Sequence, residues 1–495
     1  MKVLILIPFL IYLLILFTFS YFTNRKTSQD LTGFFLGDRN VSPYTSAVSA
    51  AISGRGAWLL FGVTAQAYIN GLSAIWLIVG FLISEFFLFV FLAPQVRKFT
   101  GINSSVTFID MFASRYKDET ISLRIVLSIV LIFFSLSFIA AQFMGGGIAF
   151  FAFLGISNTH GIIITGVIVL LLVLIGGYKS LNDTDVLNAL LILFVLTIMP
   201  VIVLFRNEGI DVIHSELLKA NSSFFDFGAL STGTLIGFLS LGLSSSGNTG
   251  ILLKYIALRD SEKFPQLAVI TTLVSLLMTV AALFTGISAR IYFPTPDSIP
   301  GADAQNVFIG LTGAILHPLL IGLVLCSIFG SLLSSAGSNI LVAGSSLVID
   351  IYEKTISRGK SISQDKLRYI SSIAIVILAY IAIIAGALLD TSFYGFVLFA
   401  LAGLGASFGP AILLTFFWSE STSNGVKAGV ITGALTVIFW KSIPGLSENL
   451  YELIPGFILS VLAIWWGSKI DRRIVLNRLY KTAKYEDIKK TNFSE

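Results

Sequence analysis

Two long apolar segments of this chain are interrupted by glycine and serine, and these interruptions constrain the fold more than any other feature. The first is the run SGRG at 53–56, within the apolar stretch 48–68. The second is the run SSSGNTG at 244–250, within the stretch 230–256. A helix that faces lipid cannot be broken in this way, because its freed backbone groups would find no partners in hydrocarbon. Glycine also lets helices pack closely, but paired breaks in the two halves of a chain favour a transporter's binding site.

The composition identifies the class of protein as a polytopic membrane protein. Of 495 residues, 55% are hydrophobic and 12% are charged, against about 25% charged residues in soluble domains. The mean hydropathy is +0.90. The single cysteine, Cys326, lies in an apolar run and excludes a disulfide framework. The three histidines are scattered, and no metal-ligand or catalytic cluster is present, so we expect neither an enzyme nor a cofactor.

The apolar runs predict an all-α protein with about 13 transmembrane helices, since about 20 apolar residues span a bilayer. The first run is expected to remain as a spanning helix rather than to be cleaved as a signal peptide, and the ninth is expected to bend near His317-Pro318. The predicted spans are 3–22, 45–68, 72–96, 122–149, 160–178, 186–205, 230–256, 265–289, 308–350, 369–389, 394–418, 425–440 and 453–468.

The basic residues predict the topology. With a cytoplasmic C-terminus, about 26 of the 32 Lys and Arg residues fall on the cytoplasmic side. The pI near 9.1 therefore reports membrane orientation and not nucleic-acid binding. We expect one transmembrane domain, residues 1–470, in the cell membrane, with the N-terminus outside and no obligate protein partner. Residues 471–495 are expected to form a polar, basic cytoplasmic tail at the membrane surface.

Several motifs together resemble the sodium/solute symporter family, and most of all its sodium/proline symporter branch. The motifs are FFLGDR at 34–39, Ser53 with Trp58, Gly71 with Trp76, FIDMF at 108–112, GGY at 176–178 with Thr184, Asp185 and Asn188, FGP at 408–410, GALTVIFWK at 433–441 and LYELIPGF at 450–457. The resemblance implies a LeuT-like core of two inverted five-helix repeats, at about 45–205 and 230–418. The two broken spans are then the first helix of each repeat.

A serine stripe in the ninth span predicts an ion site. Ser331, Ser334, Ser335 and Ser338 recur at helical spacing and share one face. Serines in membrane helices also bond the carbonyl one turn back and pack against other helices, which is the alternative.

The resemblance assigns the sodium ligands. It implies that the Ser334 and Ser335 hydroxyls bind Na+, together with the carbonyls of Ile52, Arg55 and Ser331. Asp185 matches a family aspartate on the sodium exit path. Hydroxyls and carbonyls carry no titrating proton, so this set favours Na+ over H+ coupling.

The two breaks depart from the proline-symporter pattern, which makes proline itself doubtful as the solute. Gly54 and Arg55 replace an aspartate and a methionine, and small hydroxyl residues replace an aromatic residue and a proline in the second break. The predicted solute-binding residues are Ser53, Gly54, Arg55, Ser245, Ser246 and Asn248.

Arg55 leaves three interpretations open. Its guanidinium could bind a substrate carboxylate, pair with Glu85 or extend outward, or place its charge where sodium would bind. Glu85 lies in the middle of the third span and needs a partner or a proton there.

The sequence therefore predicts Na+-coupled uptake of a small organic solute, an amino acid such as proline or a small carboxylate, by alternating access. The alternatives are a sodium-independent or proton-coupled carrier of the same fold, and a membrane sensor that does not transport.

Overall fold

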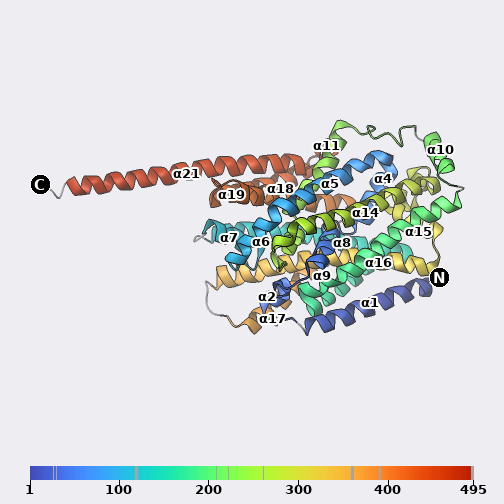
Figure 1. Ribbon diagram of the computed structural model, residues 1–495, viewed down its shortest axis with the longest axis horizontal. Coiled ribbons are helices and arrows are strands. Elements are labelled where there is room, and N and C mark those ends of the chain that lie inside the picture. The colour runs from blue at the N-terminus through green and yellow to red at the C-terminus, as the bar shows by residue number, and fades with distance from the viewer. Residues whose placement is uncertain are drawn as a thin grey trace.

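The computed structural model is a bundle of helices, with one isolated bridge between Val41 and Leu258 as the only β pairing among the described residues. It describes the whole chain except residues 26, 29, 118–120, 208, 221, 260, 358–361, 390–391 and 492–495. The helices run side by side, and the two termini lie at opposite ends of the bundle (Figure 1). The all-helical fold that the apolar runs predict is confirmed.

The helices of the first half are α1 (Lys2–Asn24), α2 (Leu31–Leu36), α3 (Pro43–Ser53), α4 (Thr64–Asn70), α5 (Ile75–Phe87), α6 (Ala93–Ile102), α7 (Phe108–Tyr116), α8 (Ser122–Leu154) and α9 (Asn158–Arg206). Those of the second half are α10 (Ile210–Ala220), α11 (Thr232–Ser240), α12 (Ser244–Gly247), α13 (Thr249–Ala257), α14 (Phe264–Tyr292), α15 (Val307–Ile315), α16 (Pro318–Ser345), α17 (Gln364–Leu388), α18 (Phe393–Phe417), α19 (Ser423–Ser442), α20 (Leu446–Asn449) and α21 (Leu453–Thr491).

The described residues contain nine helices that are long and apolar enough to span a membrane, or ten if the bent pair around Asn248 counts as one span. Two of these helices, Leu59–Ile102 and Asn158–Arg206, each continue past a glycine that divides two predicted spans, Gly71 in the first and Gly177 in the second. With α19 added, the structure accounts for about 13 spans, in agreement with the hydropathy pattern.

Gly177 is the point where the chain reverses inside α9. Its φ of 58° and ψ of −162° interrupt the helix. On one side Ser180 bonds to Ser20 of α1, and further along Asn188 accepts a hydrogen bond from Tyr12 of the same helix. The second half of α9 therefore runs back along α1 toward that helix's N-terminus.

The bend expected near His317-Pro318 is confirmed. His317 has an extended backbone (ψ 147°) between α15 and α16, and Pro318 occupies the first position of α16. Proline suits this position because its missing N–H is not needed there and its φ is already helical.

The enclosed helices of the bundle are α16 and α18. In the span that contains α16, 83% of the most apolar window is buried, against 28% for α1 and for the spanning part of α21. The broken spans lie against this enclosed part, since α13 contacts α16 and α12 contacts α18. α21 continues as one helix to Thr491 and extends beyond the rest of the bundle (Figure 1).

Candidate functional site

The first break begins where α3 ends and is a turn over residues 54–57. Gly56 has a φ of +59°, which favours glycine. A β-carbon at Gly56 would lie 2.5 Å from Gln142 Oε1 and 2.6 Å from Ser335 Oγ. The unwound backbone is therefore pressed directly against the serine stripe of α16.

The second break is narrower than the sequence run predicts. Residues 244–247 are helical as α12, and the backbone leaves the helix at Asn248, with ψ 106°. α13 starts immediately afterwards at an angle of 46°. The Asn248 side chain accepts a hydrogen bond from the Gly250 N–H at 3.0 Å and so caps α13. Because the Asn248 side chain itself caps α13, the chain can start this helix without a long unwound segment before it.

The two breaks meet in the interior. Asn248 Nδ2 donates to the Gly54 carbonyl at 3.5 Å, and a β-carbon at Gly54 would lie 2.7 Å from Ile251 Cδ1. Ser53, Gly54 and Asn248, all predicted to bind solute, are therefore close together. Ser246 instead bonds back to the Leu243 carbonyl at 2.6 Å. Ser245 is buried in α12.

The predicted sodium ligands Ser334 and Ser335 of α16 lie against the first break. Ser334 Oγ lies 2.7 Å from Ser53 Oγ. Ser335 Oγ donates to the Ser331 carbonyl at 2.9 Å. The Ile52 carbonyl accepts the N–H groups of Arg55 and of Gly56, each at 3.0 Å. The structure thus places Ser334 against Ser53, and Ser335 against Gly56, in the first break. Hydroxyl and carbonyl oxygens are donors that suit a hard cation.

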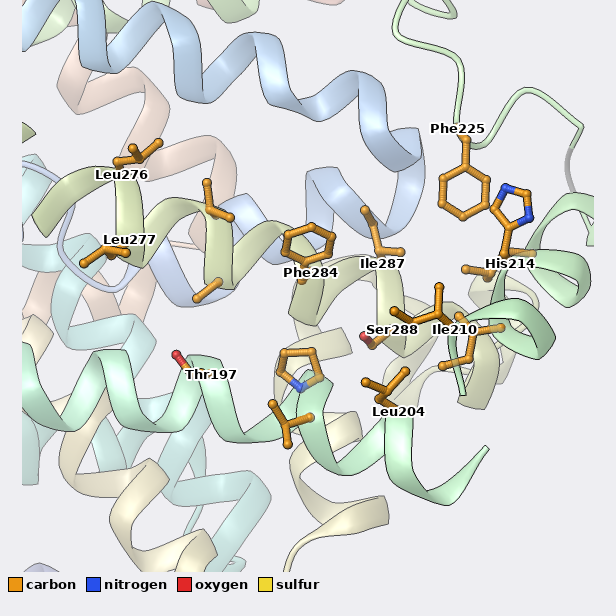
Figure 2. Close-up of a pocket in the computed structure, with 16 residues that line it drawn as sticks. Thr197, Leu204, Ile210, His214, Phe225, Leu276, Leu277, Phe284, Ile287 and Ser288 are labelled. Atoms are coloured by element: carbon orange, nitrogen blue, oxygen red, sulfur yellow. The ribbon is translucent and has the colours of Figure 1, made fainter. Parts of the chain in front are cut away.

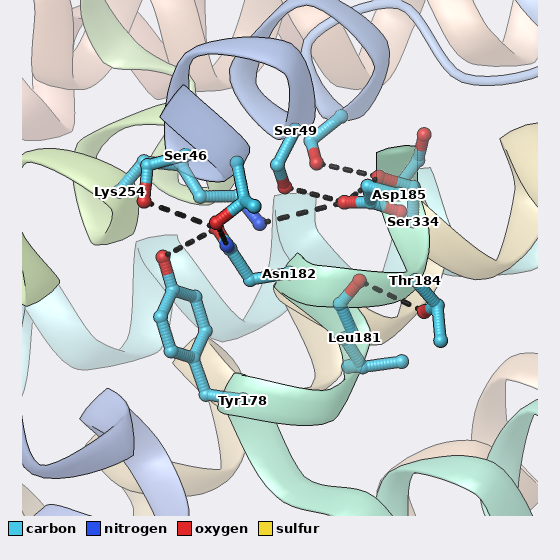
Figure 3. A network of polar contacts seen from close by, with 12 residues as sticks. Ser46, Ser49, Tyr178, Leu181, Asn182, Thr184, Asp185, Lys254 and Ser334 are labelled. Carbon is cyan, nitrogen blue, oxygen red and sulfur yellow. Dashed lines mark hydrogen bonds and ion pairs between the residues drawn. The ribbon is translucent and has the colours of Figure 1, made fainter. Parts of the chain in front are cut away.

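Asp185 lies beside this oxygen cluster, in the second half of α9. It is fully buried, and its carboxylate accepts hydrogen bonds from Ser49, from Ser334 at 2.8 Å and from Asn188 at 3.2 Å (Figure 3). The family resemblance implied that Asp185 lies on an exit path for the ion. The structure in addition bonds it to Ser334, one of the predicted ligands.

Lys254 is the charged residue of this region that sequence reasoning missed. It falls within the predicted span 230–256, but none of the sequence motifs assigned it a role. It lies within α13 with 1% of its surface exposed. Its Nζ is 3.8 Å from Asp185 Oδ2 and 4.9 Å from the centre of the Tyr178 ring. Hydropathy alone could not show this contact, because a lysine near a helix end can also extend its amine to the membrane surface.

Gln142 of α8 is a second missed residue. Its Oε1 accepts the Ala57 N–H at 3.0 Å, and its Nε2 is buried with no hydrogen-bond partner in the described part of the chain. A lone amide in an otherwise apolar helix was the available signal.

The Arg55 side chain pairs with Glu85, which was one of the three interpretations that the sequence left open for Arg55. The two groups form a buried ion pair at 3.0 Å, and Ser275 Oγ donates to the same Glu85 oxygen at 2.9 Å. Arg55 also donates to the Ala51 carbonyl at 2.8 Å. The pair thus joins the first break to α5 and α14.

A large apolar cavity lies away from this cluster. It measures about 660 Å³ between α9, α10 and α14, with His214 and Phe225 at one end (Figure 2). It contains none of the residues predicted to bind sodium or solute. The predicted site itself is closed, since Ser53, Asn248 and Ser334 are all buried.

A helical bundle with two broken spans that meet beside a buried oxygen cluster is the architecture of a secondary transporter. The model of the sodium:solute symporter family matches residues 34–433. The chain belongs to this family. The predicted family is confirmed, and the class is that of sodium-coupled solute symporters, not of enzymes.

Two bacterial proline transporters are similar to this chain over most of its length. The high-affinity proline transporter PutP of Bacillus subtilis is 30% identical over 90% of this chain and 94% of its own length. A sodium/proline symporter of Staphylococcus aureus is 28% identical over 94% of this chain and 92% of its own.

Two solved structures share the fold. A Na+-coupled sialic acid symporter, substrate-bound and outward-open, has a TM-score of 0.81 at 16% identity, covering 94% of this chain and 97% of its own. MHP1, a nucleobase-cation-symport-1 family transporter in a closed conformation, has a TM-score of 0.54 at 12% identity, covering 88% of this chain and 94% of its own. The LeuT-like fold that the resemblance implied is therefore confirmed.

Proposed function

We propose that this membrane protein takes up a small zwitterionic solute, an amino acid such as proline, together with Na+. The ion would bind between the first break and α16, with the Ser334 and Ser335 hydroxyls and the carbonyls of Ile52, Arg55 and Ser331. The solute would bind where the two breaks meet, near Ser53, Gly54 and Asn248. No cofactor other than the coupling ion is required.

One observation carries the proposal: the Ser334 hydroxyl contacts Ser53 of the first break and donates to the Asp185 carboxylate at 2.8 Å. Donation to a carboxylate polarises the O–H bond and makes the serine oxygen a better acceptor for a cation. The carboxylate also supplies negative charge near the ion in a dry interior, where electrostatic attraction is strong.

The Arg55–Glu85 pair favours a zwitterion over an acidic solute. The guanidinium is already neutralised at 3.0 Å, so a carboxylate would have to displace Glu85 from it. A zwitterion brings both charges and can be accommodated beside the pair without leaving a net charge buried. The proline transporters among the relatives agree with this class of solute.

The proposed orientation has the N-terminus outside and the C-terminus in the cytoplasm, as the distribution of Lys and Arg indicates. Inward movement of one Na+ then gains about 2.3 kcal/mol per 100 mV of membrane potential. Na+ shifts the protein between its outward-open and inward-open states only if it binds one of them more tightly.

The test is uptake of labelled amino acids, carboxylates and sugars into proteoliposomes, with and without an inward Na+ gradient. We expect Na+-driven accumulation of an amino acid. The double variant Ser334→Ala, Ser335→Ala should raise the half-saturating Na+ concentration at least tenfold, because it removes two oxygen ligands.

The matched control is Ser371→Ala in α17, a buried serine whose hydroxyl bonds the Leu367 carbonyl at 2.8 Å away from the site. Its Na+ dependence should equal that of the unmodified protein. An unchanged Na+ requirement in the double variant would refute the sodium site, and accumulation of sugars alone would refute the solute class.

A further inference from the structure

The buried amine of Lys254 has no role in the ligand set described above. It makes no hydrogen bond with any part of the chain that the structure describes, although an ammonium group carries three donors. A buried charge without partners is costly and is retained only beside an opposite charge. The Asp185 carboxylate, 3.8 Å away, is that charge (Figure 3).

Asp185 connects Lys254 to the proposed sodium site. One of its oxygens, Oδ2, both accepts the Ser334 hydroxyl at 2.8 Å and faces Lys254 Nζ. The same carboxylate oxygen is therefore available to the ammonium from one side and lies next to the ion's ligand on the other. A cation at Ser334 and the ammonium of Lys254 must share its negative charge.

We propose that Lys254 is a built-in competitor of the coupling ion: its ammonium neutralises Asp185 when Na+ is absent and weakens Na+ binding when the ion is present. This inference rests on the proposed sodium site. The charges support it, because Asp185 and Lys254 together are neutral without Na+ and carry one positive charge with it. Without Lys254, by contrast, Na+ would neutralise a lone buried carboxylate.

The placement of the two groups allows the competition to change during transport. Lys254 lies on α13, in the second broken span, whereas Asp185 and Ser334 lie on α9 and α16. A movement of α13 relative to these helices alters the distance between the ammonium and the carboxylate. Approach of the ammonium favours release of Na+, and its withdrawal favours binding.

The experiment compares Na+ binding by the full-length protein and by Lys254→Met. Methionine keeps much of the length of the side chain but not its charge. Na+ binding is read in detergent from the Na+ concentration that gives half-maximal thermal stabilisation, and in proteoliposomes from the half-saturating Na+ concentration for uptake. We expect both concentrations to fall at least tenfold in the variant, while Lys254→Arg, which keeps the charge, stays near the unmodified protein.

A second pair of variants covers the case that Lys254→Met does not fold because Asp185 is left unpaired. Asp185→Asn leaves the lysine charge unopposed and should bind Na+ most weakly. Adding Lys254→Met to it should restore much of the lost affinity. The matched control is Lys441→Met, which breaks a contact between another lysine and a buried carboxylate, that of Glu452 at 4.0 Å, and should leave Na+ binding unchanged.

The outcomes separate this inference from the proposed function. Na+-dependent stabilisation of the unmodified protein with no change on removing Lys254, in either background, would refute the competition and leave the sodium site standing. Absence of any Na+-dependent stabilisation or uptake in the unmodified protein would refute both.

Discussion

At the scale of single residues, the site is defined by buried charges that occur in opposite pairs. Arg55 pairs with Glu85 at 3.0 Å, and Lys254 pairs with Asp185 at 3.8 Å. Each pair joins two separate segments of the chain. Arg55 lies in the first break, and Lys254 lies in α13, which follows the second break. A buried charge that lost its partner would cost far more than the pair itself contributes.

The Arg55–Glu85 pair gives a prediction at this scale. Arg55→Met alone, or Glu85→Gln alone, should each destabilise the protein by about 3–5 kcal/mol, because one buried charge is left uncompensated. The double variant should recover most of this loss. The stability of the three variants is measured by thermal unfolding in detergent. If the double variant lost as much stability as the two single variants together, the two side chains would not act as a pair.

At the scale of elements, glycine decides where a long helix is interrupted. Gly177 reverses the chain within α9 with φ +58°, in a region of backbone conformation that is almost confined to glycine. A β-carbon there would also lie 2.9 Å from the Phe34 carbonyl oxygen. Both spans that meet at this residue depend on this one conformation.

We therefore expect Gly177→Ala to destabilise the protein by about 1–3 kcal/mol and to lower the yield of folded protein. Gly313→Ala is the control, since nothing lies within 4 Å of its β-carbon position in α15; it should be neutral or stabilising by up to about 1 kcal/mol. Thermal unfolding in detergent compares the two. Equal stability of both variants would contradict the role of Gly177.

At the scale of the whole molecule, an ionic network joins helices that are distant in the sequence. Arg124 at the start of α8 bonds to Asp110 of α7 and to Asp350, each at 2.6 Å, and Lys354 bonds to Asp110 at 2.7 Å. The network ties the short helix α7 to the end of the span that contains α16. It thereby links three separate segments of the chain.

The charge of Asp110 makes the stability of this ionic network dependent on pH. Burial by itself raises the pKa of the Asp110 carboxyl, but Lys354 and Arg124 hold that pKa below its ordinary value. The stabilisation of the folded protein by the Asp110 carboxylate is therefore complete above the ordinary pKa of about 3.9. It is lost as the pH falls through the lower pKa that Asp110 has in the folded protein.

We expect Asp110→Asn to lose about 2 kcal/mol of stability at pH 7, and the difference from the unmodified protein to shrink as the pH falls below about 4. Unfolding measured against pH in detergent tests this, with the exposed Asp297→Asn as control. A difference that stays constant down to the lowest pH would contradict an ionic origin of this stabilisation.

The sequence by itself determined the helical fold, the approximate number of spans, the family and the two interrupted helices. These features are local: apolar run length sets the spans, and Gly56, Asn248 and Pro318 fix the backbone where they stand. Only the tertiary structure showed that the second break is confined to Asn248, that Arg55 pairs with Glu85, and that Lys254 faces Asp185. The last two pairs join residues 30 and 69 positions apart, and such contacts depend on how whole helices pack, which no local pattern of residues encodes.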